Sequence, residues 1–137
     1  DDIEPRLLNS AYKDRIHFVG YEPETALYHA GSDVYALTSR EDPFPNVVLE
    51  SFDAGVPVVA FSSTGGAARL VGDIGGIVVP NLNTAEYSAA ICRLLDSPDL
   101  SASLGKTAQE YVDRHFSFRA YLSDLCGMLG VNLPTGE

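Results

Sequence analysis

Four short apolar runs, separated by segments of helical length, restrict the fold of this chain more than any other feature. The runs are 15-RIHFV-19, 33-DVYAL-37, 57-PVVAF-61 and 76-GIVVP-80. Such β-branched and aromatic runs are typical of strands that are buried on both faces of a parallel sheet, whose crossover helices cover those faces. The sequence therefore predicts an α/β fold with right-handed β-α-β crossovers.

Helix boundaries are marked by capping residues. Asn83 followed by Glu86 resembles a capping box, and Gly31 and Gly55 stand where left-handed residues often end a helix. The predicted helices span residues 23–31, 45–55 and 66–72 between the strands, and then about 84–96, 98–116 and 117–129.

The last predicted helix carries an apolar stripe that we expect to pack on the core. Residues 131–137 after it read as a tail. The stripe has helical spacing and consists of Phe118, Tyr121, Leu122, Leu125 and Leu129.

Composition places the chain among folded globular domains. Its 137 residues are 45% apolar and 20% charged, which is ordinary usage for one domain with a sizeable core. The formal charge of -10, from 19 acidic and 9 basic residues, repels a polyanion and excludes a nucleic-acid partner bound through its phosphate backbone. An anionic ligand must therefore be held locally.

The sequence predicts a cytoplasmic protein without a metal site. No apolar run approaches the roughly 18 residues that cross a bilayer, and no charged-then-apolar leader opens the chain. Cys92 and Cys126 lie in helical patterns without metal-ligand spacing, so both are expected to be small buried side chains in a reducing compartment. His17, His29 and His115 are read as structural side chains.

The stretch 42-DPFPNVVLE-50 holds the strongest candidate site. It leaves the carboxyl end of a predicted strand, the edge at which open parallel sheets bind ligands. Its two prolines lack amide donors, and the backbone amides around Asn46 and Val47 at the helix start favour an anion. Asp42 and Glu50 on either side suit a ligand with hydroxyls at both ends and phosphate between. Alternatively, Asp42 stabilises a turn and Glu50 interacts with the helix dipole.

Longer motifs surround this stretch and resemble one enzyme family. The run 39-SREDPFPNVVLESFDAGVPVVAFSSTGG-66 resembles the signature of retaining GT-B glycosyltransferases of the GT4 type, in which an acid, seven residues and a Glu precede a helix, a strand and a Gly-Gly loop. The resemblance implies a Rossmann-like domain, the C-terminal half of a GT-B enzyme, with additional C-terminal helices. It covers nearly the whole chain and includes 14-DRIHFVGY-21, 30-AGSDVYALTS-39, 76-GIVVP-80, 89-AAICRLLDSP-98 and 115-HFSF-118.

The resemblance also implies roles for single residues. Asp42 matches the acid beside the donor sugar, and Glu50 matches the acid that holds the ribose hydroxyls. Both are then binders and not the acid and nucleophile of a glycosidase pair, which must flank one scissile bond. The turn whose amides approach sugar and phosphate matches Phe44, Pro45 and Asn46.

Three further positions belong to the loop after the next strand. Gly65 and Gly66 match the family's Gly-Gly loop. Arg69 stands where the family often has Glu, and it is expected either to assist phosphate binding or to lie on a solvated helix face. The family also usually has Glu where this chain has Asp42, whose side chain is one methylene shorter.

The resemblance further implies that residues 1–130 are part of the C-terminal nucleotide-sugar-binding domain, with an acceptor-binding N-terminal domain elsewhere in a parent protein. That domain would also place the protein at the cytoplasmic face of a membrane. Two strands that carry a Gly-Arg stretch and a Lys in the family are not present before residue 15. We therefore expect 15–19 to pair directly with 33–37, or free strand edges to pair with another copy, or marginal stability.

The implied function is sugar transfer from a nucleoside-diphosphate sugar, linked to UDP or GDP, to an acceptor hydroxyl with retained configuration. No cofactor is expected, because the nucleotide sugar is the donor substrate. The chain alone would be inactive. The alternative is a non-catalytic nucleotide-binding or interaction module, which the departures at Asp42 and Arg69 favour. An epimerase of similar fold is disfavoured, because such enzymes lack the acid-x7-Glu pattern.

Overall fold

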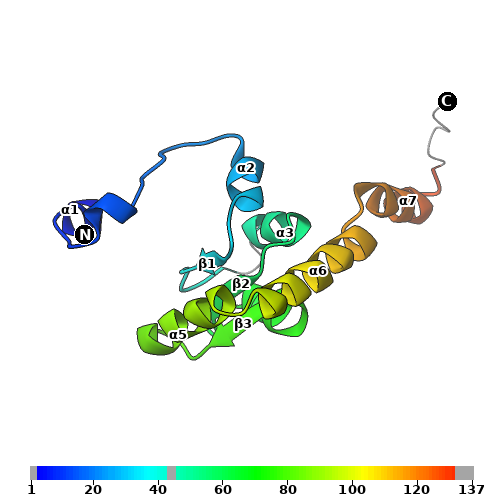
Figure 1. The fold of residues 1–137 in the computed structure, drawn as a ribbon. Coiled ribbons are helices and arrows are strands. Elements are labelled where there is room, and N and C mark those ends of the chain that lie inside the picture. The colour runs from blue at the N-terminus through cyan, green and yellow to red at the C-terminus, as the bar shows by residue number, and fades with distance from the viewer. Residues whose placement is uncertain (1–2, 43–45, 132–137) are drawn as a thin grey trace.

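A three-stranded parallel sheet forms the centre of the molecule. The computed structural model describes residues 3–42 and 46–131. The strands β1 (Tyr35–Leu37), β2 (Val58–Phe61) and β3 (Gly76–Val79) lie in the order β1-β2-β3 (Figure 1). All neighbouring strands are parallel, as predicted.

Helices cover both faces of the sheet, which confirms the predicted α/β class. All four residues of β2 are buried, and alternate side chains point to opposite faces. Val58 and Ala60 belong to one apolar cluster, and Val59 and Phe61 belong to the other. The first cluster is completed by Leu37, Val48, Phe52, Ala67, Val71 and Ala108, and the second by Val79, Tyr87, Ala90 and Leu94.

The helices that form these two layers follow the predicted order. A π-helical stretch, η2 (Val71–Gly75), extends α4 (Gly66–Leu70) beyond the predicted end at residue 72. Two N-terminal elements were not predicted: α1 (Ile3–Leu8) and the 3₁₀ helix η1 (Lys13–Arg15). The remaining helices are α2 (Thr25–Ala30), α3 (Asn46–Asp53), α5 (Thr84–Leu95), α6 (Pro98–His115) and α7 (Phe118–Leu129).

The predicted strand at 15–19 is wrong. Lys13–Arg15 is helical, residues 16–20 belong to no strand, and His17, Phe18 and Val19 are exposed. A β-branched and aromatic run becomes a strand only when a neighbour supplies backbone partners and a surface to pack on. No such neighbour stands beside this run in the described part of the chain.

The expected direct pairing of 15–19 with 33–37 is therefore also wrong. Within the described ranges β1 pairs only with β2, so its other edge offers unpaired backbone groups. Ala36 in the middle of β1 is exposed. Open edges of this kind favour strand addition, so pairing with another copy stays a prediction.

The ends of α3 and α5 show how local sequence sets the helix limits. The side chain of Asn83 accepts a hydrogen bond from the backbone N–H of Glu86 at 3.1 Å, as the capping box predicts. The Glu86 carboxylate accepts from the side-chain amide of Asn83 at 2.8 Å, and not from its backbone N–H, which bonds to Pro80. Gly55 after α3 has a φ of 72° and confirms the predicted left-handed position. Gly31 is different, because its φ of -93° is accessible to any residue and the left-handed prediction is wrong there.

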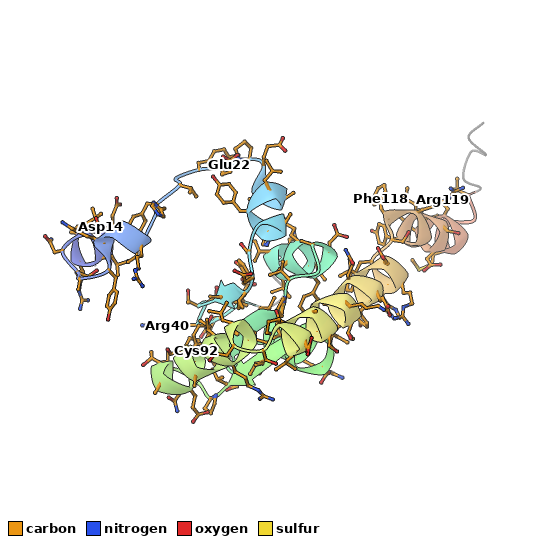
Figure 2. The ribbon with its side chains drawn as sticks, in the orientation of Figure 1. Asp14, Glu22, Arg40, Cys92, Phe118 and Arg119 are labelled. Carbon is orange, nitrogen blue, oxygen red and sulfur yellow. The ribbon has the colours of Figure 1, made fainter. Side chains whose placement is uncertain are left out.

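The predicted packing of the last helix on the core is wrong. Three residues of the stripe, Phe118, Tyr121 and Leu129, are 72%, 60% and 67% exposed. The helix α7 continues away from the sheet beyond the end of α6, and Figure 2 shows Phe118 and Arg119 at its start, remote from the sheet. Leu122 and Leu125 are half-buried, but no residue of the stripe belongs to either core cluster of the described chain.

Both cysteines differ from the buried side chains that the sequence predicts. Cys92 is exposed, and Cys126 is only half-buried. On α5 the buried residues are Tyr87, Ala90 and Leu94, and Cys92 lies off that face because successive helical residues are about 100° apart (Figure 2).

No helix in the described ranges is long and apolar enough to span a membrane.

The buried phenol of Tyr87 makes the stability of this core sensitive to alkaline pH. Tyr87 donates a hydrogen bond to the carbonyl of Val59 at 3.0 Å, and its ring lies 4.5 Å from that of Phe61. Burial, together with the nearby Tyr35, raises the pKa of Tyr87 from 10.0 to about 12. The folded protein thus keeps the phenol protonated where the unfolded chain has already lost the proton, which stabilises the fold below pH 10.

This contribution should disappear as the pH rises from about 10 to about 12. With about 1.4 kcal/mol for each pKa unit, the free energy of unfolding should fall by about 2–3 kcal/mol over that window. In Tyr87→Phe the free energy of unfolding should fall much less over this pH window. In the control Tyr12→Phe, which changes an exposed side chain, it should fall as in the unmodified chain. Urea midpoints at pH 9, 10.5 and 11.5 measure the effect, and equal alkaline slopes for both variants would contradict it.

Candidate functional site

Hydrogen bonds join the loops at the carboxyl ends of the strands. The backbone N–H of Asp42, after β1, donates to the carbonyl of Thr64, after β2, at 3.3 Å. Thr64 is fully buried, and both its N–H, at 3.1 Å, and its hydroxyl donate to the carbonyl of Phe61. These bonds fix the loop that carries Asp42 against the end of the neighbouring strand.

The loop after β2 is joined to β3 in the same way. The backbone N–H of Ser62 donates to the carbonyl of Val79 at 2.8 Å, and the hydroxyl of Ser63 donates to the side chain of Asn81 at 2.6 Å. All three loops at this edge are therefore held together. In an open parallel sheet this is the edge where ligands bind.

Glu50 projects from α3 into solvent on one side and toward α2 on the other. Its side chain is 45% exposed. The hydroxyl of Thr25 donates to Glu50 Oε2 at 3.2 Å, and His29 Nε2 lies 3.6 Å from the same oxygen. The carboxylate is thus neither buried in hydrocarbon nor fully free, which suits a group that accepts hydrogen bonds from a ligand.

The phenol of Tyr35 is influenced by the charges of both candidate carboxylates. Burial raises the pKa of Tyr35, and the negative charges of Glu50 and Asp42 raise it further. Glu50 is linked to Tyr35 through His29, whose Nε2 lies 3.6 Å from Glu50 Oε2 and whose ring centroid lies 5.3 Å from that of Tyr35.

The Gly-Gly pair lies where β2 passes into α4. Gly65 has φ 75° and ψ -132°, a conformation that residues with a Cβ rarely adopt, and α4 begins at Gly66. Both glycines are exposed. Arg69 is 89% exposed and its Nε lies 3.7 Å from Asp73 on the same helix, so its guanidinium lies on a solvated face.

The start of α3 holds the other predicted site residues. Asn46 is the first residue of α3 and is exposed. Val47 is partly buried and packs against the apolar cluster that contains Val58 and Ala60. Any ligand contact of Val47 would thus come from its backbone. Phe44 and Pro45 lie outside the described residues.

Three residues of this region were not predicted as site residues. Thr25 and His29 come from α2, and Tyr35 comes from the middle of a strand pattern. Their proximity to Glu50 follows from the packing of α2 on α3, which no local pattern specifies. The available signal was the four-residue spacing of Thr25 and His29, which puts them on one helix face.

No group of three metal-ligating side chains occurs in the part of the chain that the structure describes.

The model of one protein family, described as glycosyl transferases group 1, matches residues 3–111. The chain belongs to this family. The match includes the three strands and the site just described. It confirms the resemblance drawn from 39-SREDPFPNVVLESFDAGVPVVAFSSTGG-66 at the level of glycosyltransferases with the GT-B architecture.

Curated relatives of this group 1 glycosyltransferase chain are longer proteins. The lipopolysaccharide core biosynthesis glycosyltransferase LpsE of Rhizobium meliloti is 26% identical over 120 residues, which are 88% of this chain and 35% of LpsE. A D-inositol 3-phosphate glycosyltransferase of Salinispora tropica is 32% identical over 123 residues, 85% of this chain and 24% of that protein. The chain thus spans about a third or less of the length of these relatives.

Solved structures of longer proteins share the fold. Anabaena HepE, solved in complex with UDP, has a TM-score of 0.84 and 23% identity over 93% of this chain and 35% of HepE. Sucrose-phosphate synthase from Thermosynechococcus elongatus has a TM-score of 0.82 and 29% identity over 93% of this chain and 33% of the synthase. The group 1 chain therefore folds like one part of these longer enzymes.

Proposed function

We propose that this chain is the donor-binding part of a retaining hexosyltransferase of the GT4 type. The whole enzyme would transfer a sugar from a nucleoside-diphosphate sugar, linked to UDP or GDP, to an acceptor hydroxyl. Membership of the group 1 glycosyltransferases supports this proposal. HepE, whose structure the chain resembles, is solved in complex with UDP and with UDP-glucose.

The observation that carries the proposal is that the Asp42 loop is bonded to the Thr64 loop at the carboxyl edge of the sheet, while Glu50 lies half-exposed on the helix that follows. Ionised carboxylates only accept hydrogen bonds, and sugar and ribose hydroxyls donate them. We assign Glu50 to the ribose hydroxyls and Asp42 to the donor sugar. The diphosphate would then lie between them, against the first amides of α3 and the Gly65 turn.

Catalysis in this proposal depends on positioning and charge. The leaving diphosphate gains negative charge as the bond to the sugar breaks, and amides fixed at a helix start stabilise that charge without reorganising. Asp42 and Glu50 hold the two ends of the donor in place. Phe44, Pro45, Asn46, Val47 and Gly66 are assigned to the walls of the same site, and Arg69 has the weakest assignment because it pairs with Asp73.

The remaining substrate would be bound by a domain outside this chain. We propose that residues 1–130 are part of a C-terminal donor-binding domain, and that an N-terminal domain of the same polypeptide binds the acceptor. The relatives' greater length supports this division. The chain alone would then be inactive, and the parent would be cytoplasmic, with its N-terminal domain at the face of a membrane.

Titration of the 137-residue chain with UDP and GDP tests the proposal. We expect one of the two to bind, and Glu50→Gln to weaken that binding at least about 10-fold, because a hydrogen bond to a charged group contributes about 1.5–3 kcal/mol. Asp42→Asn should leave the nucleoside diphosphate unaffected and weaken only the matching nucleotide sugar. Calorimetry or NMR chemical-shift titration gives the dissociation constants.

The matched control is Glu110→Gln on α6, which changes an exposed Glu that pairs with Arg114 and Lys106. It should bind nucleotide like the unmodified chain. Absence of binding to both nucleotides, or equal affinity of the Glu50→Gln variant, would overturn the proposal. Nucleotide binding by the chain without sugar transfer by the longer polypeptide would instead favour the non-catalytic module.

A further inference from the structure

Two side chains of α2 approach the same oxygen of Glu50. Thr25 Oγ1 donates a hydrogen bond to Glu50 Oε2 at 3.2 Å. His29 Nε2 lies 3.6 Å from that oxygen, which is beyond a direct hydrogen bond and leaves an electrostatic contact. Both contacts use Oε2, and among the described residues no side chain bonds to Oε1, which can therefore face a ligand.

His29 is fixed by its own surroundings. It is only 6% exposed, the one buried residue of α2, and its ring centroid lies 5.3 Å from that of Tyr35 in β1. The imidazole therefore stands between the strand and Glu50 and can turn little. Thr25 lies one helical turn earlier on the same face and is exposed.

The Thr25–Glu50 hydrogen bond adds little to folding stability. Thr25 is exposed and the Glu50 side chain is 45% exposed, so water would satisfy both groups if they separated. Exposed polar pairs contribute little to the free energy of folding. The contact of the buried His29 with Glu50 is not an exposed pair of this kind. Both contacts have a geometric effect, because they restrict the rotamers of a carboxylate that would otherwise sample several.

We infer that Thr25 and His29 are positioning residues that hold Glu50 through Oε2 and present Oε1 to the hydroxyls of a nucleotide ribose. This inference rests on the proposed function, which gives Glu50 the ribose contact. A ribose offers two adjacent hydroxyl donors, and a carboxylate held in one orientation binds them without losing rotamer freedom at that moment. Thr25 and His29 act through Glu50 and do not touch the ligand.

The ratio of the affinities for UDP and 2′-deoxy-UDP tests this role. If the chain prefers guanine, GDP and 2′-deoxy-GDP take their place. Thr25→Val keeps the shape of the side chain and removes its hydroxyl. We expect it to weaken binding of the ribonucleotide about 3- to 10-fold and that of the deoxynucleotide less, because deoxyribose keeps only one of the two hydroxyls that Glu50 would accept from. Thr25→Ser should restore discrimination, and His29→Phe, which keeps a ring against Tyr35, should lose it.

Thr107→Val is the matched control, because Thr107 is exposed on α6 and its hydroxyl donates to the carbonyl of Ser103 in the same helix. It should change neither affinity. A second readout needs no ligand: the side-chain carboxyl ¹³C signal of Glu50 should move in Thr25→Val and His29→Phe and stay in place in Thr107→Val.

The possible outcomes separate this inference from the proposed function. If Glu50→Gln weakens ribonucleotide binding but Thr25→Val and His29→Phe keep full discrimination, the function stands and the positioning role is overturned. An unmoved Glu50 carboxyl signal overturns the positioning role whatever the ligand does. If the unmodified chain binds neither ribonucleotide, the proposed function fails, and the positioning role fails with it.

Discussion

Replacing Gly105 with alanine should destabilise the folded chain by about 3 kcal/mol. Gly105 is a buried residue of α6 that faces the end of α3. A Cβ at this position would lie 1.9 Å from the carbonyl oxygen of Gly55 and 2.8 Å from its carbonyl carbon. Real Cβ atoms do not approach backbone atoms so closely, so α6 must move away from α3.

The backbone around Gly55 cannot yield instead. Gly55 has a left-handed φ of 72°. The next residue, Val56, is held by two hydrogen bonds. Its backbone N–H donates to the carbonyl of Ser51 at 2.9 Å, and its carbonyl accepts from the hydroxyl of Ser51 at 3.1 Å. Gln109 also donates to the carbonyl of Asp53 at 2.7 Å and ties the two helices together. Moving α6 would break this bond and strain the turn.

Equilibrium unfolding in urea measures the loss for Gly105→Ala. The matched control is Gly127→Ala on α7, where an added Cβ meets no atom within 4 Å. That variant should be unchanged or more stable by about 0.5–1 kcal/mol, because alanine is the better helix former. A loss below about 1 kcal/mol for Gly105→Ala would mean that α6 and α3 separate easily, and the close approach would then have little influence on stability.

The sequence specified the centre of the fold because a buried parallel strand has a strong local pattern. Four consecutive buried residues, 58–61, form β2, and its two faces require a helix layer each. The run 15–19 has similar composition but is not a strand. Its state depends on a neighbouring strand, which composition does not encode. The apolar stripe of α7 likewise indicates which face is apolar but not what covers it.

In the candidate site, too, some residues could be predicted from local sequence and others could not. Asp42 and Glu50 were predicted from their places around a loop and a helix start, and Gly65 from the resemblance of the surrounding run to the glycosyltransferase signature. Thr25 and His29 reach Glu50 only because α2 packs against α3. Tertiary packing of this kind leaves only a weak periodic signal in sequence, so positioning residues are harder to predict than the groups they position.

Replacing Phe52 with alanine should reduce the free energy of unfolding by about 3–5 kcal/mol. Phe52 is fully buried in α3, two residues after Glu50, and packs in the cluster that joins the helix to Val58 and Ala60 of β2. Its ring also approaches Gly75: a Cβ at that position would meet Phe52 Cε1 at 3.2 Å. Removing the ring would leave a cavity where α3, β2 and η2 meet, and these backbones cannot fully collapse into it.

Urea unfolding of Phe52→Ala, Phe52→Leu and Phe118→Ala measures this effect. Phe52→Leu keeps most of the apolar contact and should lose only about 1 kcal/mol, so it stays folded if the alanine variant does not. Phe118→Ala makes the same chemical change at a side chain that is 72% exposed, and surface changes usually stay within about 0.5 kcal/mol. Because α3 carries Glu50 as well as Phe52, the loss of nucleotide affinity in Phe52→Ala should follow its unfolded fraction. Equal stability of the Phe52→Ala and Phe118→Ala variants would show that α3 is not held by this ring.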